Sequence, residues 1–316
     1  MLQEILFSAL VSLSPSEKKV IDNLQLKLKK DGYDISQYLD DSRFQIYTFN
    51  KEKKLINYAD TTKSWYMKKE SLEQCADFIE EYNFWLKRAE EKYGPSPEHI
   101  ASQLQLETNL GQYTGERPLI NSFISVYLDR PDRRTEFYKY ITDFLDLFSD
   151  TTDNIIYPKD IFDIKGSWAG AYGIAQGMPT IIKKYGKIAD GDGDGMYNPM
   201  NIPDAIEFVG LYLSDHGFSK NPSGAIQRYN GGHPFYGSSI GKHTAELKKV
   251  MEKRKRTPLD KIDYKINCKT NPLAIKINPI ESNKLQNIKI DTTYQKIQTK
   301  QPFIKKIFIN RKIGKA

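Results

Sequence analysis

Two amphipathic helical patterns, separated by the pair Gly94-Pro95, constrain the fold of this chain more than any other feature. In residues 71–94 apolar side chains recur every three or four positions, as they do on the buried face of an α-helix. They are Cys75, Phe78, Ile79, Tyr82, Phe84, Trp85 and Ala89. Ser96 can then cap a second helix, and Pro97 suits its first position. We therefore expect one long helix before Gly94-Pro95 and another directly after it.

Similar helical patterns recur along most of the chain and stop near its C-terminal end. We expect further helices in 16–48 (two, broken at 29–34), in 134–148, after Pro179, in 203–217 and, as a short helix, in 224–232. After about residue 256, short β-branched runs with Asn-Pro punctuation replace this pattern. The sequence thus predicts a mainly α fold with a small C-terminal appendage that is β-rich or partly disordered.

Glu107 is the one acid in the run 103–115. On a helical wheel at about 100° per residue it falls inside the apolar arc. The arc is formed by Ile100, Leu104, Leu106 and Leu110. Burial disfavours a charged carboxylate and raises its pKa, which makes a proton donor near neutral pH. A structural acid that is paired in the core, or simply misplaced, explains the same position.

The segment 166–179 is too rich in glycine and alanine for a regular element. Small residues bring the backbone close to whatever packs there, and Ser167 and Gln176 add neutral hydrogen-bonding groups. These groups suit the hydroxyl and acetamido groups of an amino sugar, although a tight helix–helix crossing explains the same composition. Further along, Tyr229 and Asn230 precede a Gly-Gly turn, where they either face a cleft or only form the turn.

The acidic run 190–195 matches the opening of an EF-hand calcium loop, with carboxylates at positions 1, 3 and 5 and glycine at position 6. Position 12 is Asn201 instead of the usual glutamate, so an acid three residues later would have to close a lengthened loop. The predicted calcium ligands are Asp190, Asp192, Asp194, Met196 through its carbonyl, and Asp204. The alternative is an exposed acidic turn.

Charge is distributed unevenly along the 316 residues, whose net charge is +7. Residues 253–316 hold 17 basic and 4 acidic residues, so they carry +13 and leave −6 for the remainder. Such a basic segment binds an anionic wall or membrane polymer or nucleic acid, or is merely solvated. Because no recognisable nucleic-acid motif accompanies it, nucleic acid is not expected as a partner.

Signals for the cellular compartment are weak. No stretch is long enough to span a bilayer. Residues 5–13 resemble the apolar part of a signal peptide, but Glu4 precedes them and no Lys or Arg does. An amphipathic first helix explains this stretch at least as well.

Four of these segments together resemble lytic murein transglycosylases of the B type, which belong to the lysozyme-like superfamily. The segments are 88–115, 166–179, 189–217 and 225–232, and they occur in the order seen in that family. The resemblance extends from about residue 20 to about residue 245 and is densest between 87 and 232. It implies an N-terminal helical region (1–85), a lysozyme-like domain with a calcium loop (86–252) and a basic extension (253–316).

The resemblance also implies an activity. Members cleave the β-1,4 bond between N-acetylmuramic acid and N-acetylglucosamine in peptidoglycan and leave a 1,6-anhydro end. Glu107 matches the residue that acts as the only catalytic acid and base in this family. The residues that match the family's sugar-binding positions are Ser167, Gln176, Tyr229, Asn230, Arg133 and Arg134. Calcium is expected with the ligands named above, with no organic cofactor, and the substrate places the protein in the bacterial periplasm or cell envelope.

Three positions depart from the family pattern, and two other functions stay open. Gly177 stands where a Phe is expected, Phe137 stands for a Tyr, and a Tyr expected after Asn230 is either Tyr236 or replaced by Phe235. One alternative function is a muramidase, which needs a second carboxylate such as Asp129 or Asp132. The other is a non-catalytic protein that binds or scaffolds the cell wall.

Overall fold

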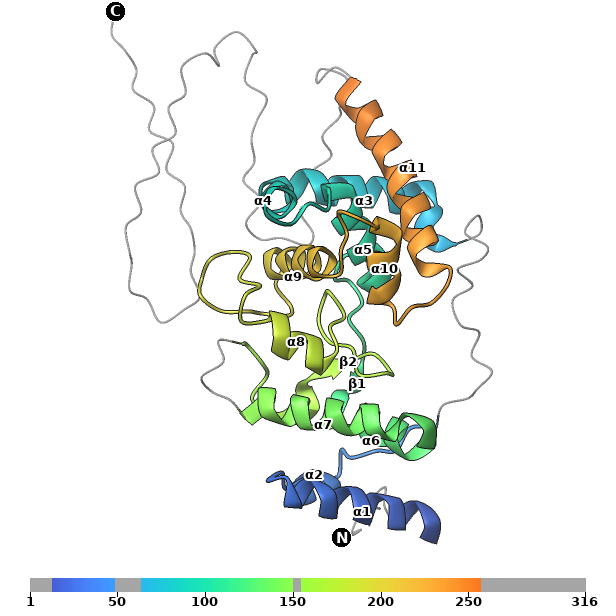
Figure 1. Cartoon of the computed structure of the whole chain (residues 1–316), viewed down its shortest axis with the longest axis vertical. Helices are drawn as coiled ribbons and strands as arrows, with labels where there is room; N and C mark the ends of the chain where they lie inside the picture. The colour runs from blue at the N-terminus through green and yellow to red at the C-terminus, as the bar shows by residue number, and fades with distance from the viewer. Residues whose placement is uncertain (1–12, 49–63, 150–154, 257–316) are drawn as a thin grey trace, which may run out of the picture. The chain divides into compact units, whose positions relative to one another are not determined.

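The computed structural model describes residues 13–48, 64–149 and 155–256, which all belong to one compact unit extending to Leu259. Its elements are almost all helices (Figure 1), so the predicted mainly α class is confirmed. A second unit, Asp260–Ala316, lies outside the described residues, as does nearly all of the predicted C-terminal appendage. The boundaries of the three predicted regions stay predictions.

The described ranges contain α-helices, short 3-10 helices and one small sheet. The α-helices are α1 (Pro15–Lys30), α2 (Ser36–Leu39), α3 (Lys69–Glu81), α4 (Asn83–Tyr93), α5 (Pro97–Thr108), α6 (Leu119–Asp129), α7 (Arg134–Ser149), α8 (Pro179–Tyr185), α9 (Ile202–Asp215), α10 (Pro222–Tyr229) and α11 (Tyr236–Arg256). The 3-10 helices are η3 (Trp65–Met67), η4 (Pro131–Arg133) and η5 (Ile161–Asp163). Strands β1 (Arg117–Pro118) and β2 (Lys165–Gly166) pair antiparallel, with Arg117 opposite Gly166.

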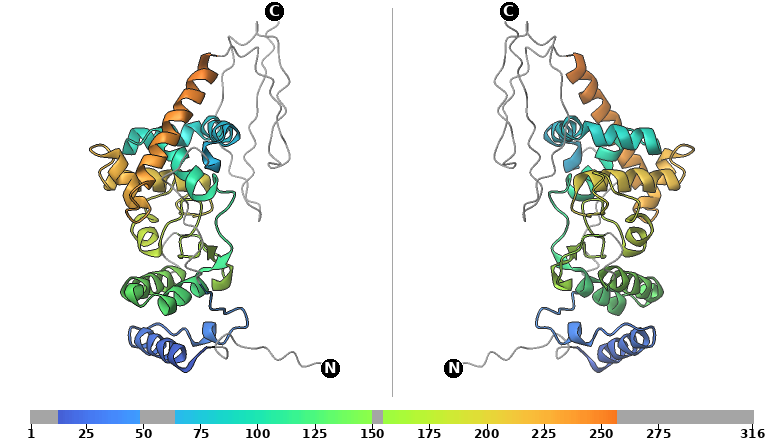
Figure 2. Two further views of the ribbon diagram at one scale, coloured as in Figure 1. Left: turned by 90° about the vertical axis from the view of Figure 1, so that its right-hand side faces the viewer. Right: turned by 90° about the vertical axis from the view of Figure 1, so that its left-hand side faces the viewer.

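The single helix expected over 71–94 is wrong in one respect, because the chain breaks at Tyr82 into α3 and α4. Tyr82 leaves helical geometry (φ −101°, ψ 20°) and packs its ring on Phe78 at 4.8 Å between centroids. The two halves then have different partners, since α3 packs on α11 and α4 packs on α9. The two views in Figure 2 show α4 at a steep angle to α3, which one continuous amphipathic face cannot achieve.

Helix α5 lies in the middle of this arrangement, in contact with α3, α4, α9 and α11 (Figure 1). Most of its residues are buried, including polar Ser102, Gln103 and Gln105. Helix α7 packs on both α6 and α8, α6 also contacts strand β1, and α8 also contacts α9. Helix α5 is therefore mostly enclosed by protein, and its last turn is the part that stays partly exposed, at Leu106 and Glu107.

Across the described ranges, none of the helices combines the length and the apolar character that a membrane crossing requires.

Candidate active site

Glu107 lies in the last turn of α5, where the chain reverses sharply. Asn109 and Leu110 both adopt left-handed conformations, with φ of 52° and 58°. Ile100 and Leu104 are fully buried on the same arc of the helix, as the wheel predicts. The Glu107 side chain keeps part of its surface accessible, yet the protein around it raises its pKa to about 7. A large fraction of Glu107 is therefore protonated near neutral pH.

Two side chains hold the Glu107 carboxyl in place. The Tyr236 hydroxyl, at the start of α11, donates to Glu107 Oε1. Gln103 Nε2 donates to the same oxygen at 3.0 Å and to the Tyr236 hydroxyl at 2.6 Å. Both bonds to Glu107 favour the carboxylate and so lower its pKa, but burial outweighs them.

The geometry favours Tyr236 over Phe235 for the aromatic position that the sequence left open. Tyr236 is 1% exposed and contacts Glu107, whereas Phe235 is 48% exposed. Gln103 was not singled out in the sequence. Its spacing of four residues from Glu107 places both on one helix face, and this is the signal that identifies it.

The glycine-rich segment is bound to α5 and α10 through its backbone. Thr108 Oγ1 donates to the Ile174 carbonyl at 2.8 Å, and the Tyr229 hydroxyl donates to the Ala175 carbonyl at 2.6 Å. Gln176 follows with a φ of 51°, a left-handed conformation that residues other than glycine seldom adopt. Such strain is often found at functional sites, and here the two side chains fix the backbone that carries it.

The predicted sugar-binding residues differ in how many hydrogen-bonding groups they leave available. Gln176 Nε2 donates to the Thr114 and Gly173 carbonyls at 3.1 and 2.8 Å, which leaves its amide oxygen as an acceptor. Ser167 Oγ accepts from the Ala171 N–H at 3.0 Å and keeps its own proton as a donor. Asn230 follows α10, and its partly exposed side chain makes no hydrogen bond within the described residues.

A cavity of about 640 Å³ adjoins Gln176 and Tyr229. Its walls come from η4, from α7, from the segment 176–178, and from helices α8, α9 and α10. Its lining includes the charged residues Asp132, Glu136, Lys139 and Arg228, together with Gly177 and Phe208. Glu107 itself does not line this cavity, so the cavity lies beside the carboxyl rather than around it.

Arg133 and Arg134 are engaged by their own neighbourhood. Arg133 binds Glu136 through Nε at 2.8 Å and stacks 4.8 Å from the Phe137 ring. Arg134 donates from Nε to the Tyr127 carbonyl at 3.1 Å. Neither residue lines the cavity, although others from the same turn do. Their role in sugar binding stays a prediction.

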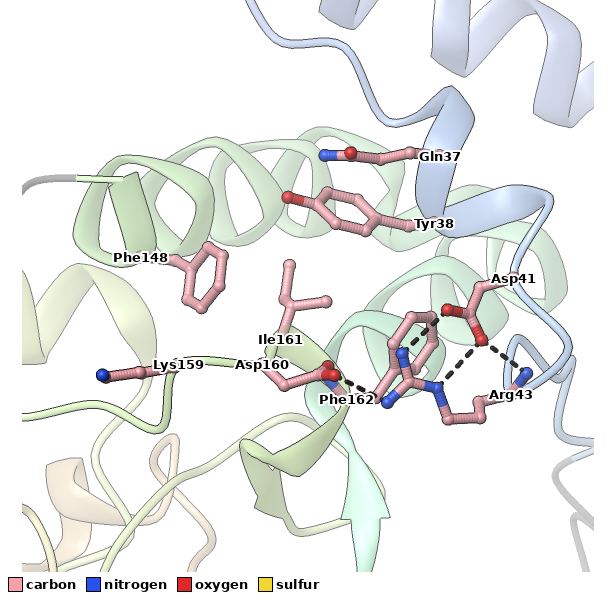
Figure 3. Close-up of a pocket in the computed structure, with 9 residues that line it drawn as sticks. All are labelled: Gln37, Tyr38, Asp41, Arg43, Phe148, Lys159, Asp160, Ile161 and Phe162. Carbon is pink, nitrogen blue, oxygen red and sulfur yellow. Dashed lines mark hydrogen bonds and ion pairs between the residues drawn. The ribbon is translucent and has the colours of Figure 1, made fainter.

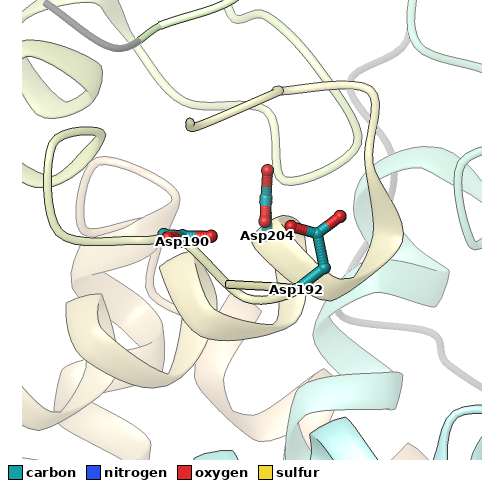
Figure 4. A group of neighbouring side chains, drawn as sticks. All are labelled: Asp190, Asp192 and Asp204. Atoms are coloured by element: carbon teal, nitrogen blue, oxygen red, sulfur yellow. The ribbon is translucent and has the colours of Figure 1, made fainter. Parts of the chain in front are cut away.

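The acidic loop brings Asp190, Asp192 and Asp204 together (Figure 4). One carboxylate oxygen of each lies within 4.8 Å of the others. Calcium–oxygen distances of 2.3–2.6 Å put ligands on opposite sides of one ion about 4.6–5.2 Å apart, so the spacing fits calcium. Asp194 is not in this group, and its Oδ1 accepts from the Met196 N–H at 2.8 Å.

Asp204 gives a second argument for a cation at this place. It is 1% exposed, and no Lys or Arg pairs with it in the described parts of the chain. Its two oxygens accept the Gly191 and Asn198 N–H groups, each at 2.7 Å, but burial still raises its pKa to about 6. A buried carboxylate of this kind is stabilised by a cation, so the donor set suits calcium.

A separate cavity, of about 500 Å³, lies between α2, the end of α7 and η5 (Figure 3). Arg43 crosses one side of it and pairs with Asp41 at 2.8 Å and Asp160 at 2.7 Å. Its guanidinium also stacks 4.5 Å from the Phe162 ring. These contacts attach the segment after α2 to η5.

Comparison with known proteins identifies the family. Residues 18–270 match the family described as the transglycosylase SLT domain, which is most of the chain. The chain belongs to this family. A curated relative, membrane-bound lytic murein transglycosylase B of Escherichia coli K12, is 32% identical to this SLT-domain protein over 149 residues. That match covers 47% of this chain and 39% of the relative, so the chain spans about two fifths of the relative's length.

Solved structures support the fold of the SLT-domain protein. Escherichia coli Slt35 in complex with calcium superposes with a TM-score of 0.61 and 20% identity, over 75% of this chain and 94% of that one. SltB3 from Pseudomonas aeruginosa, in complex with NAG-anhNAM-pentapeptide, gives 0.58 and 16% over 74% and 80% of the two chains. The predicted resemblance to B-type lytic transglycosylases is therefore confirmed at the level of family and fold.

Proposed function

We propose that this protein is a peptidoglycan lytic transglycosylase in which Glu107 acts first as the acid and then as the base. The observation that carries the proposal is a single carboxyl with a pKa of about 7, held by Tyr236 and Gln103. Burial and these two donors account for that pKa, and Asp132, a candidate for the second acid of a muramidase, is exposed and paired with Arg130 at 2.8 Å. Hydrolysis normally needs such a second acid, so a reaction in which the substrate supplies the nucleophile fits better.

The proposed reaction cleaves one glycosidic bond and forms another within the substrate. Protonated Glu107 donates its proton to the glycosidic oxygen between N-acetylmuramic acid and N-acetylglucosamine as the bond to C1 breaks. The acetamido oxygen of the muramic acid stabilises the positive charge at C1. The Glu107 carboxylate then removes the proton from the muramic O6, which bonds to C1. Glu107 ends protonated, and no water is consumed.

The sugar-binding residues would orient the strand for these steps. Ser167 and Gln176 offer one donor and one acceptor, and Asn230 offers both through its amide. Tyr229 would act mainly by fixing the backbone before Gln176, since its hydroxyl is already bonded to Ala175. Arg133 and Arg134 would approach the strand from the η4–α7 turn.

Calcium is proposed as a structural ion in the acidic loop, held by Asp190, Asp192 and Asp204. Asp194 and the Met196 carbonyl complete the ligand set predicted from the sequence. A bound ion would offset the repulsion among these carboxylates and supply no chemistry to the reaction. In support, the related Slt35 has been solved in complex with calcium.

The mass of the products tests the proposed reaction. Purified peptidoglycan incubated with the protein should yield muropeptides one water lighter than hydrolysis products. Products that all carry the added water would instead indicate a muramidase. An unchanged substrate would favour a non-catalytic wall-binding protein.

Removing the Tyr236 hydroxyl should move the pH profile. Its hydrogen bond lowers the pKa of Glu107, so Tyr236→Phe should raise that pKa by roughly 0.4–1 unit, for a bond worth about 0.5–1.5 kcal/mol. Because the reaction begins with protonated Glu107, the alkaline limb of kcat/KM should shift to higher pH, while the maximum falls severalfold. Phe235→Leu is the matched control and should leave the limb in place. An unmoved or acid-shifted limb in Tyr236→Phe would contradict the assignment.

The substrate would place the protein in the bacterial periplasm or cell envelope, and the basic extension would add attraction to anionic wall or membrane polymer. Deleting residues 257–316 should preserve cleavage of small soluble muropeptides. It should weaken binding to intact sacculi, mostly at low salt, because charges are screened over about 10 Å at 0.1 M. Sedimentation of sacculi with each protein measures this, and equal binding at every salt concentration would refute the role.

A further inference from the structure

Arg228 differs from the other charged residues that line the 640 Å³ cavity beside the catalytic carboxyl. Asp132 is paired with Arg130 at 2.8 Å, and Glu136 is bound by Arg133 at the same distance. Lys139 is neutralised by the buried Asp143, also at 2.8 Å. Arg228 has no carboxylate within 4.0 Å in the described ranges, so its positive charge is the uncompensated one in the lining.

The hydrogen bond that Arg228 makes within the protein uses only one nitrogen of its guanidinium. Its Nη1 donates to the His216 carbonyl at 3.0 Å, which satisfies the end of α9. The Nε and Nη2 groups make no hydrogen bond among the described residues and stay available. A guanidinium binds a carboxylate through two parallel hydrogen bonds, and this geometry makes arginine a better carboxylate ligand than lysine.

The rest of the cavity lining is largely apolar, and at Gly177 the wall is closely packed. A Cβ on Gly177 would lie 2.8 Å from Ile182 Cγ1 and 3.0 Å from Phe208 Cζ, so a side chain does not fit there. The volume of about 640 Å³ is in the range of binding sites for ligands the size of a short peptide or disaccharide. An apolar cavity with one free guanidinium thus selects a ligand that combines aliphatic groups with a carboxylate.

We propose that this cavity binds the peptide stem of the muramic acid next to the cleaved bond, with Arg228 pairing with a stem carboxylate. The proposal rests on the proposed function, because it takes peptidoglycan as the substrate. The sugars of the glycan strand are uncharged, whereas the stem carries both carboxylates and aliphatic side chains. The cavity shares Gln176 and Tyr229 with the predicted sugar site, so a stem attached to a bound sugar can reach it.

Binding of matched ligands to an inactive protein tests this. In the Glu107→Gln background, calorimetry would compare a disaccharide carrying its peptide with the same disaccharide after the peptide has been removed. We expect the peptide to strengthen binding, and Arg228→Gln to remove about tenfold or more of that gain, as expected for a charged hydrogen bond. Affinity for the peptide-free disaccharide should not change. Arg228→Lys should restore only part of the gain.

The control removes a positive charge elsewhere. Lys184→Gln on α8 has the same change in charge, and its exposed side chain pairs with Asp215. It should leave both affinities unchanged. Equal losses for both ligands, together with a lower melting temperature, would show that Arg228 only completes the end of α9 and would overturn the proposal. Unchanged binding, or binding of neither ligand, would also overturn it, whereas a wild-type protein that binds but does not cleave would refute only the proposed reaction.

Discussion

Glu107→Gln should abolish turnover of peptidoglycan, with a loss on the order of 10²–10⁴-fold or more, while the protein still folds and binds glycan. The amide has the shape of the carboxyl and can accept the same bonds from Tyr236 and Gln103. It has no proton to transfer at neutral pH. Mass spectrometry of the digested sacculi measures the loss. Retention of more than a few per cent of activity would remove Glu107 from its proposed role.

The same substitution should stabilise the protein at alkaline pH. The pKa of Glu107 rises from its ordinary value of 4.5 to about 7 on folding, so between these values the folded state binds more protons than the unfolded state. Stability therefore falls as pH rises through this window, by roughly 1–3 kcal/mol. Glu107→Gln avoids this loss, so its melting temperature should exceed that of the wild type at pH 8 and approach it at pH 4. A lower melting temperature at pH 8 would contradict the burial argument.

Removing calcium should lower the melting temperature by on the order of 5–10 °C. An ion present at 100 times its dissociation constant contributes about 2.7 kcal/mol to the folded state, and each kcal/mol moves the transition of a domain this size by about 2–4 °C. Thermal unfolding with calcium and with a chelator measures the difference. The physical cause is the cluster of Asp190, Asp192 and the buried Asp204, which repel one another without a cation.

Asp192→Ala should abolish most of the response to calcium, because it removes one ligand without disturbing the buried Asp204. The exposed Asp22 on α1 provides the control, and Asp22→Ala should respond like the wild type. If neither the chelator nor Asp192→Ala moves the transition, the loop is an ordinary acidic turn. Loss of turnover without loss of stability would point instead to a metal that takes part in the reaction.

Local patterns in the sequence predicted most of the helices, although not α6 or α11, and they singled out Glu107 as the candidate acid. The apolar arc around Glu107 predicted that its surroundings would raise its pKa, and the spacing of Asp190 and Asp192 predicted two carboxylates on one tight loop. Both features depend on residues within a few turns of one another, and the backbone geometry of a helix or a loop fixes such short distances. The four segments 88–115, 166–179, 189–217 and 225–232 also carried the resemblance to the family.

Only the tertiary structure decided which distant groups meet. Tyr236 reaches Glu107 across 129 residues, and helix periodicity has no information about that contact. The break at Tyr82 arises because α3 and α4 pack on different helices, so packing overrides a pattern that reads as one helix. Arg228 is likewise one of many basic residues in the sequence, and its free guanidinium is defined by which acids pack elsewhere. Local conformation follows from neighbours along the chain, whereas burial, pairing and pKa follow from neighbours in space.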